Sequence, residues 1–171
     1  MKNITCHENY PVFFIIVANL IDFIIYAAGI FIFLQFHWIL VVGYILYILL
    51  LYYRLFTSSC VHCYYYGKLC AFGKGKLCSL FFKKGDPEKF LTMKITWKSI
   101  LPDFMVFLVP AAFGIVKLIQ DFDWILFAII IIAFGFVGFV GNAIVRGAYA
   151  CKFCKQRELG CPAEQLFNKS S

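Results

Sequence analysis

The sequence predicts an all-α integral membrane protein with four transmembrane helices, arranged as two helical hairpins that are each followed by a cytoplasmic cysteine loop. Hydrophobic residues make up 63% of the 171 residues and charged residues only 15%. A soluble domain has about 45–50% apolar and about 25% charged residues. The apolar residues form two long blocks, and the same pattern of three cysteines follows each block. This composition excludes a disordered chain and argues strongly against a soluble domain.

The first apolar block, residues 11–57, is long enough for two spanning helices, because one span needs about 20 apolar residues. Its only polar interruption is the Gln-Phe-His-Trp stretch at residues 35–38. We therefore expect one helix at residues 11–34 and a second at residues 38–57, joined by a tight turn.

The second block is divided in the same way by two aspartates within residues 120–124, which predicts helices at residues 99–119 and 124–147. Pro102 suits the first turn of the third helix, where a missing N–H is not needed. Pro110 lies in the middle of that helix and predicts a kink. A membrane span tolerates such a proline when a neighbour satisfies the freed carbonyl.

Lysine and arginine predict the orientation in the cell membrane. The loop between the two blocks contains eight lysines between residues 68 and 98, three basic residues follow the last span, and neither tight turn contains Lys or Arg. The positive-inside rule places the basic loop and both termini in the cytoplasm. The net charge of +7 is thereby assigned to topology and anionic lipid headgroups, and no nucleic acid is expected as a partner. The predicted organisation is an N-terminal tail (1–10), a first hairpin (11–57), a basic cysteine-rich loop with an interfacial segment (58–98), a second hairpin (99–147) and a cysteine-containing tail (148–171).

The interfacial segment is predicted from a helix start within the basic loop. Asp86 followed by Pro87 is typical of an N-cap and a first helical position. Apolar residues lie on both sides of this start, at residues 80–82 and 90–97, and favour a short amphipathic element in the membrane interface. The alternative is a plain basic linker.

An internal repeat relates the two halves. Both cysteine clusters read C-x2-C-x6-C, and the second cluster follows the first by 91 positions at all three cysteines (60 and 151, 63 and 154, 70 and 161). Each half also has an Asp-Phe pair in its first helix, a Trp-Ile-Leu at the start of its second, and an arginine at the end of its second. Both units enter from the same side, so the sequence predicts a parallel repeat that brings both cysteine loops to one membrane face.

Metal ligation is the preferred interpretation of the cysteines, because cytoplasmic thiols stay reduced and clustered cysteines at short spacing are typical metal ligands. Two four-cysteine sites use all eight cysteines. The alternative is one site shared between the two halves, formed by Cys60, Cys63, Cys151 and Cys154, and His62 and His7 are rival ligands. The two predicted sites are Cys60, Cys63, Cys70 and Cys78 for the first, and Cys151, Cys154, Cys161 and Cys6 for the second.

An iron–sulfur cluster is the favoured occupant and zinc the second. The Cys161–Pro162 pair resembles the Cys-Pro that closes ferredoxin motifs, although the spacing before it differs. Aromatic residues around the first cluster would shield either kind of centre from water. A thiol-redox role is the third interpretation, because Lys152 and Lys155 flank Cys154 and would lower thiolate pKa values. Against it, neither tight turn nor any predicted span contains a cysteine.

Asp22 is a carboxylate near the middle of the first predicted helix, where an ionised group is costly and often functional. One interpretation is an ion or proton site, and the other is an aspartate that holds two helices together. Both predict that Asp22 faces the interior of the bundle. In the last helix, glycines at positions 135, 138 and 141 indicate a face where helices approach closely.

The function expected from these features is that of a membrane-bound metal-centre protein. It would be an iron–sulfur electron-transfer subunit or membrane anchor that works with a cytosolic redox partner or within a larger membrane complex. The alternatives are a non-redox protein with structural zinc in its loops, a small transporter or metal-handling protein that uses Asp22, and a thiol-redox protein. No nucleotide-binding or hydrolytic motif occurs in the sequence, so it does not settle whether the protein is an enzyme.

Overall fold

The computed structural model describes residues 6–93 and 95–162, and in this part of the chain it is all-helical, with no β-strand. Four helices are long and apolar enough to cross a membrane, and their ends agree with the predicted helices to within a few residues. They are α1 (Val12–Leu34), α2 (Trp38–Ser58), α5 (Trp97–Gln120) and a last helix that starts as α6 (Trp124–Ile129) and continues as η2 (Ile130–Gly141) and η3 (Ala143–Cys151).

Four short elements lie between and after these helices: η1 (Cys60–His62), α3 (Lys74–Phe81), α4 (Pro87–Thr92) and α7 (Lys155–Leu159). The predicted start of α4 is confirmed, since the side chain of Asp86 accepts a hydrogen bond from the Glu88 N–H at 2.9 Å. Parts of both predicted tails, residues 1–5 and 163–171, and Lys94 of the basic loop lie outside the described residues.

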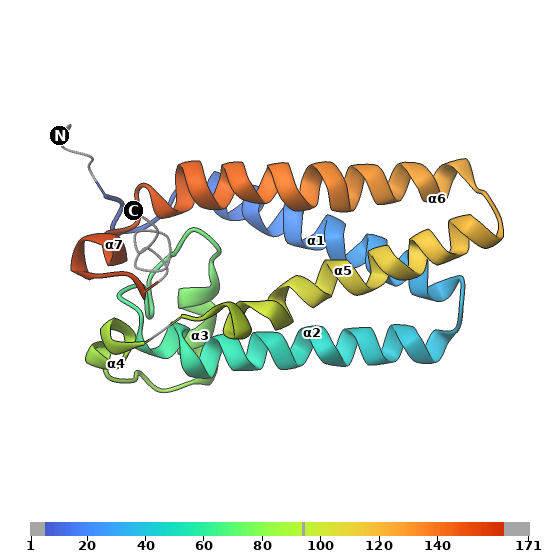
Figure 1. Cartoon of the computed structure of the whole chain (residues 1–171). Coiled ribbons are helices and arrows are strands. Elements are labelled where there is room, and N and C mark those ends of the chain that lie inside the picture. Colours follow the sequence, from blue (N-terminus) through green and yellow to red (C-terminus); the bar gives the residue numbers. More distant parts are fainter. Residues whose placement is uncertain (1–5, 94, 163–171) are drawn as a thin grey trace.

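The two first helices of the predicted hairpins form the centre of the bundle. α1 and α5 pack against each other, and each of them also contacts both α2 and η2. Figure 1 shows α2 and the last helix on opposite sides of this central pair. It also shows α3, α4 and α7 gathered at one end of the bundle and two short turns at the other.

The core between α1, α2 and α5 depends on one tyrosine. Pro110 in α5 cannot donate the backbone hydrogen bond that Val106 O would otherwise accept. The hydroxyl of Tyr44 in α2 donates to this oxygen at 2.8 Å, as the sequence analysis required of a neighbour. A Cβ added to Gly29 of α1 would lie 2.6 Å from the Tyr44 hydroxyl oxygen, so a glycine is needed where this ring crosses α1.

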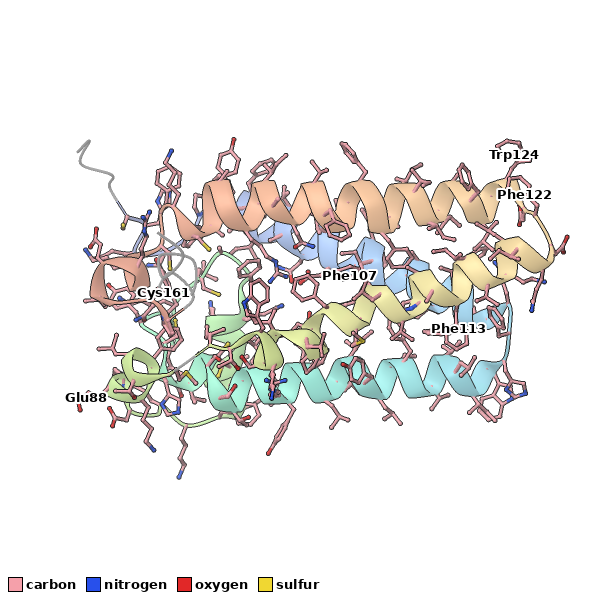
Figure 2. All side chains as sticks on the ribbon, viewed as in Figure 1. Glu88, Phe107, Phe113, Phe122, Trp124 and Cys161 are labelled. Atoms are coloured by element: carbon pink, nitrogen blue, oxygen red, sulfur yellow. The ribbon has the colours of Figure 1, made fainter. Side chains whose placement is uncertain are left out.

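The outer surface of the bundle is strongly apolar. Leu50, Ile119 and Phe136 are 65%, 81% and 66% exposed, and many neighbouring large apolar side chains are exposed with them. A soluble monomer rarely leaves so continuous an apolar surface in water, whereas a bilayer would cover it. Figure 2 shows Phe122 and Trp124 at the turn end of the bundle and Cys161 at the opposite end.

The last helix differs from the other three because η2 and η3 are π-helices, with i→i+5 hydrogen bonds. The predicted close approach at its glycines holds for Gly141, where an added Cβ would lie 3.4 Å from Ile21 Cδ1 of α1. For Gly135 the prediction is wrong, because an added Cβ would meet no atom within 4 Å. The wider π-helical turn changes which face each glycine occupies.

Candidate functional site

All eight cysteines lie at the basic end of the bundle, and all eight are free thiols. Three chain segments carry these cysteines: residues 6–11 before α1, residues 59–82 after α2, and residues 150–162 at the end of the last helix. We call these three segments together the thiol head. Its parts are distant in sequence, so their association depends on specific contacts among them.

The N-terminal segment threads between the two cysteine loops. The backbone of His7 pairs with that of Cys154 in an isolated parallel bridge. Three residues later, the Tyr10 N–H donates to Leu69 O at 2.9 Å, next to the first cluster. Burial and the neighbouring carboxylate of Glu158 in α7 raise the pKa of the Cys6 thiol. Cys6 is predicted to belong to the second cluster, and these contacts bring the N-terminal segment that carries it beside that cluster.

Two polar side chains join the cysteine loops directly. Gln156 of α7 is 5% exposed, and its Oε1 accepts a hydrogen bond from the Tyr64 N–H at 2.7 Å. Tyr65 is 2% exposed, and its hydroxyl accepts from the Lys155 N–H at 2.9 Å while donating to His7 O. The sequence analysis assigned no role to Gln156. The sequence of a polar loop does not show whether a glutamine in it is buried or exposed to solvent, so nothing in the sequence singles out Gln156.

Five of the eight cysteines pack in two apolar clusters. Cys63, Cys70 and Cys154 pack around buried Tyr10 and Tyr65, so this cluster contains thiols from both loops. Cys60 and the fully buried Cys78 pack in a second cluster with Phe56 and Val61. In the described ranges 6–93 and 95–162, no three His, Cys, Asp or Glu side chains converge closely enough to hold a metal ion.

Burial keeps the thiols at the centre of the head protonated. It raises the pKa of Cys63 to about 11, and the neighbouring Cys154, Cys70 and Cys161 add to this increase. Burial likewise raises the pKa of Cys154 to about 11, with further increases from Cys161 and Cys151. In the metal-free chain these groups are neutral thiols at neutral pH, with little nucleophilic character.

The expected lowering of thiolate pKa values by flanking lysines is therefore wrong for Cys154. The Lys155 ammonium forms an ion pair with Glu158, three residues along α7, instead of facing the thiol. Burial is the largest influence on Cys154 and has the opposite sign. The electrostatic reason for expecting an activated thiolate at this position is thus removed.

The two histidines that rivalled the cysteines as ligands have structural partners. His62 Nδ1 lies 2.9 Å from Asp86 O, which holds the first cysteine loop against the start of α4. The ring of His7 packs against the rings of Tyr10 and Phe153, with centroids 5.3 and 5.6 Å away.

Asp22 lies inside the bundle, as predicted, and is 7% exposed. Its carboxylate forms two ion pairs, with Lys74 Nζ at 3.3 Å and with Arg146 Nη2 at 3.1 Å. Lys74 is the first residue of α3, which lies in the first cysteine loop. Arg146 lies in η3, just before the second cysteine loop. We call Asp22, Lys74 and Arg146 the ion triad.

Aromatic and amide groups surround the ion triad. Lys74 Nζ lies 4.6 Å from the ring centroid of Tyr52, and Arg146 Cζ lies 4.8 Å from that of Phe72. The Arg146 Nε–H donates to Asn142 Oδ1 at 2.8 Å, one helical turn earlier. The carboxylate of Asp22 in α1 thus links α1 to α3 through Lys74 and to η3 through Arg146, which supports the helix-holding interpretation of Asp22.

A second arginine joins the other two helices near the same end. Arg54 Nη2 of α2 donates to Ser99 O in the first turn of α5 at 2.9 Å. Arg54 also interacts electrostatically with the carboxylate of Asp103, one turn further along α5. The repeat had matched Asp22 with Asp103 and Arg54 with Arg146. It did not predict that Asp22 would form an ion pair with the arginine of the other half.

The chemistry available at this end is that of cysteine sulfur beside a compact ionic network. Thiolates are ligands for zinc and iron, and a loop with little apolar core of its own gains order from ligation. Comparison with known proteins gives no match to this chain among protein-family models, curated proteins or solved structures.

Proposed function

We propose that this chain is a multi-pass cell-membrane protein that holds thiolate-ligated metal in the thiol head, with that head and both termini in the cytoplasm. The observation that carries the proposal is the meeting of three cysteine-bearing segments at one end of the bundle. The N-terminal segment pairs with both loops, and Gln156 and Tyr65 join the loops to each other. The seven lysines of residues 68–98 that the structure describes belong to the same end, which supports its cytoplasmic orientation.

A parallel repeat explains this meeting. α1 and α5 hold equivalent central places, and α2 and the last helix hold equivalent outer places. The polar contacts also join one half to the other. Asp22 of the first half pairs with Arg146 of the second half, and Arg54 of the first half donates to α5 of the second half. A twofold relation along the membrane normal would bring both cysteine loops to one face.

Two four-cysteine sites are the proposed arrangement. The first set, Cys60, Cys63, Cys70 and Cys78, belongs to the stretch after α2. Packing holds Cys63 with Cys70 in one apolar cluster and Cys60 with Cys78 in the other. The pairing of His7 with Cys154 supports Cys6 as the fourth member of the second set. Ligation would require the thiols of each set to lose their protons and turn toward a common centre. The second set is Cys6, Cys151, Cys154 and Cys161.

Iron–sulfur clusters are the proposed occupants, and electron transfer is their proposed use. Cys63 and Cys154 pack in one apolar cluster, so the two centres would be close neighbours, as consecutive carriers need to be. The aromatic rings of Tyr10 and Tyr65 would limit access of water to both centres. A cytosolic redox partner would approach the basic head. Zinc in the same sites would instead serve only to order the loops.

Single cysteine variants test the two-site arrangement. The protein is purified anaerobically in detergent as Cys63→Ser, Cys154→Ser and, as a control beside the thiols, Ser79→Ala. We expect each cysteine variant to lose one of two centres and the control to keep both. Visible absorption distinguishes iron–sulfur from colourless zinc. If either cysteine variant loses all metal, the two halves share one site and the two-site arrangement is wrong.

A further inference from the structure

We infer that Asp22 is a positioning residue that sets both cysteine loops at once, through Lys74 on one side and Arg146 on the other. The inference rests on the proposed metal-binding function for its meaning. Its structural basis is the ion triad, in which one carboxylate deep in α1 receives a cation from each half of the thiol head. No other described residue forms side-chain ion pairs with cations from both sides of the head.

The Asp22–Lys74 ion pair holds the turn between Cys70 and Cys78. Gly73 has φ of +68°, a left-handed conformation that favours glycine, and this turn directs Lys74 back into the bundle. One residue later, the Gly75 N–H donates to Cys70 Sγ at 3.3 Å. The backbone that Asp22 anchors through Lys74 therefore also holds one of the predicted sulfur ligands.

The Asp22–Arg146 ion pair holds the end of the last helix. Arg146 lies five residues before Cys151 in η3 and reaches across to Asp22 in α1. The Tyr10 hydroxyl donates to Ala150 O, which holds the same helix end from the N-terminal segment. These two contacts hold the end of η3, from which the chain continues through Cys151 to Cys154, and Asp22 supplies the contact that lies inside the bundle.

One carboxylate between two cations creates an asymmetry that can be measured. Removing Lys74 leaves the Asp22–Arg146 pair intact, and removing Arg146 leaves the Asp22–Lys74 pair intact. Removing the carboxylate leaves the largely buried Lys74 ammonium facing the half-exposed Arg146 guanidinium without a counter-ion, so both should be displaced. The effect of Asp22→Asn should reach both loops, whereas each cation variant should affect mainly its own.

The test uses the full-length chain in detergent, without metal, and follows alkylation of Cys70 and Cys154 separately by mass spectrometry. We expect Asp22→Asn to raise both rates by about tenfold through local opening. Lys74→Met should raise chiefly the Cys70 rate, and Arg146→Met chiefly the Cys154 rate. Asp121→Asn removes an exposed carboxylate that pairs with Lys117 at the far end of the bundle, and serves as the control.

Two rescue variants separate positioning from general damage to the fold. Asp22→Glu keeps the charge and should restore most of the protection at both cysteines. The triple variant Asp22→Leu, Lys74→Met, Arg146→Met replaces the ion triad by apolar groups and should keep the helices folded while leaving the loops unanchored. Unchanged alkylation in Asp22→Asn, or no rescue by Asp22→Glu, would overturn the inference.

The metal-loaded chain provides the second readout and keeps the two proposals apart. If the wild-type chain holds metal, Asp22→Asn should alter the visible or circular dichroism spectrum of both centres, and each cation variant should alter that of one. If the wild-type chain holds no metal, the proposed function fails, and the alkylation pattern alone decides whether Asp22 positions both loops.

Discussion

Single polar side chains hold the thiol head together, and Gln156 is the clearest case. It is buried between the loops, with Oε1 bound to the Tyr64 N–H and Nε2 donating to Gly160 O at 3.2 Å. Substituting a side chain of similar length but without hydrogen-bonding groups would leave the Tyr64 N–H without this partner. The contact joins the two cysteine loops at the residues next to Cys63 and Cys154.

We expect Gln156→Met to destabilise the thiol head by about 1–3 kcal/mol, the cost of leaving a buried donor unsatisfied. The measurement is hydrogen exchange at residues 60–82 and 150–162, which should accelerate in both loops. Gln120→Met, at the exposed end of α5, is the matched control and should leave exchange unchanged. Equal exchange in the two variants would show that Gln156 does not join the loops.

The raised pKa values of Cys63 and Cys154 predict a pH dependence for the metal-free protein. A pKa of about 11 in place of 9.0 lowers the thiolate fraction at pH 8 by about 100-fold, because only the deprotonated form reacts. Alkylation of both residues in the folded chain should therefore keep rising up to about pH 11, whereas the denatured chain should level off near pH 9. A folded-state rate that levels off near pH 9 would contradict the burial of these thiols.

At this scale the sequence predicted the place of Asp22 but not its partners. A carboxylate in an apolar helix has to avoid lipid, and that argument needs no knowledge of its neighbours. The pairing with Lys74 depends on how the loop returns into the bundle after Gly73, and no local pattern encodes that path. Cys6 could be assigned to the second cluster by counting ligands, but its route beside Cys154 depends on long-range backbone pairing.

The long helices illustrate why elements were easier to predict than their contacts. Their length and hydropathy follow from the thickness of a bilayer, so α1, α2 and α5 agree with the predicted spans. Short α3 begins directly after Gly73 and contains Gly75 in its first turn, and it was not predicted as a helix. The π-helical form of η2 and η3 could not be predicted from hydropathy, which does not distinguish α- from π-helical hydrogen bonding.

Packing of α1 against α2 gives a test at this scale. An alanine at position 29 would overlap the ring of Tyr44 and displace the hydroxyl that satisfies Val106 O. We expect Gly29→Ala to lower the free energy of unfolding by about 1–3 kcal/mol through overpacking. Thermal unfolding in detergent measures this change.

Gly43 in α2 provides the control for that substitution. A Cβ at Gly43 would meet no atom within 4 Å, so Gly43→Ala should be neutral or slightly stabilising, since alanine favours a helix more than glycine does. Equal destabilisation by the two substitutions would contradict the close approach of Tyr44 to α1.

The whole molecule has one apolar middle and one polar, cysteine-bearing end. The two turns at the other end carry Gln35, His37, Asp121 and Asp123 but neither lysine nor arginine. We expect a reporter fused after Ser171 to be active only in the cytoplasm, because of this asymmetry in basic residues. A reporter fused within residues 35–37 should be active only on the outer side. The reverse pattern would contradict the proposed orientation.

The most direct test of the central claim is the metal content of the full-length protein after anaerobic purification in detergent. The account predicts two thiolate-ligated centres per chain, with iron, labile sulfide and visible absorption if the occupants are iron–sulfur clusters. It also predicts that all eight thiols resist a small alkylating agent until the metal is removed. A protein that holds neither iron nor zinc, and whose eight thiols all react freely, would contradict it.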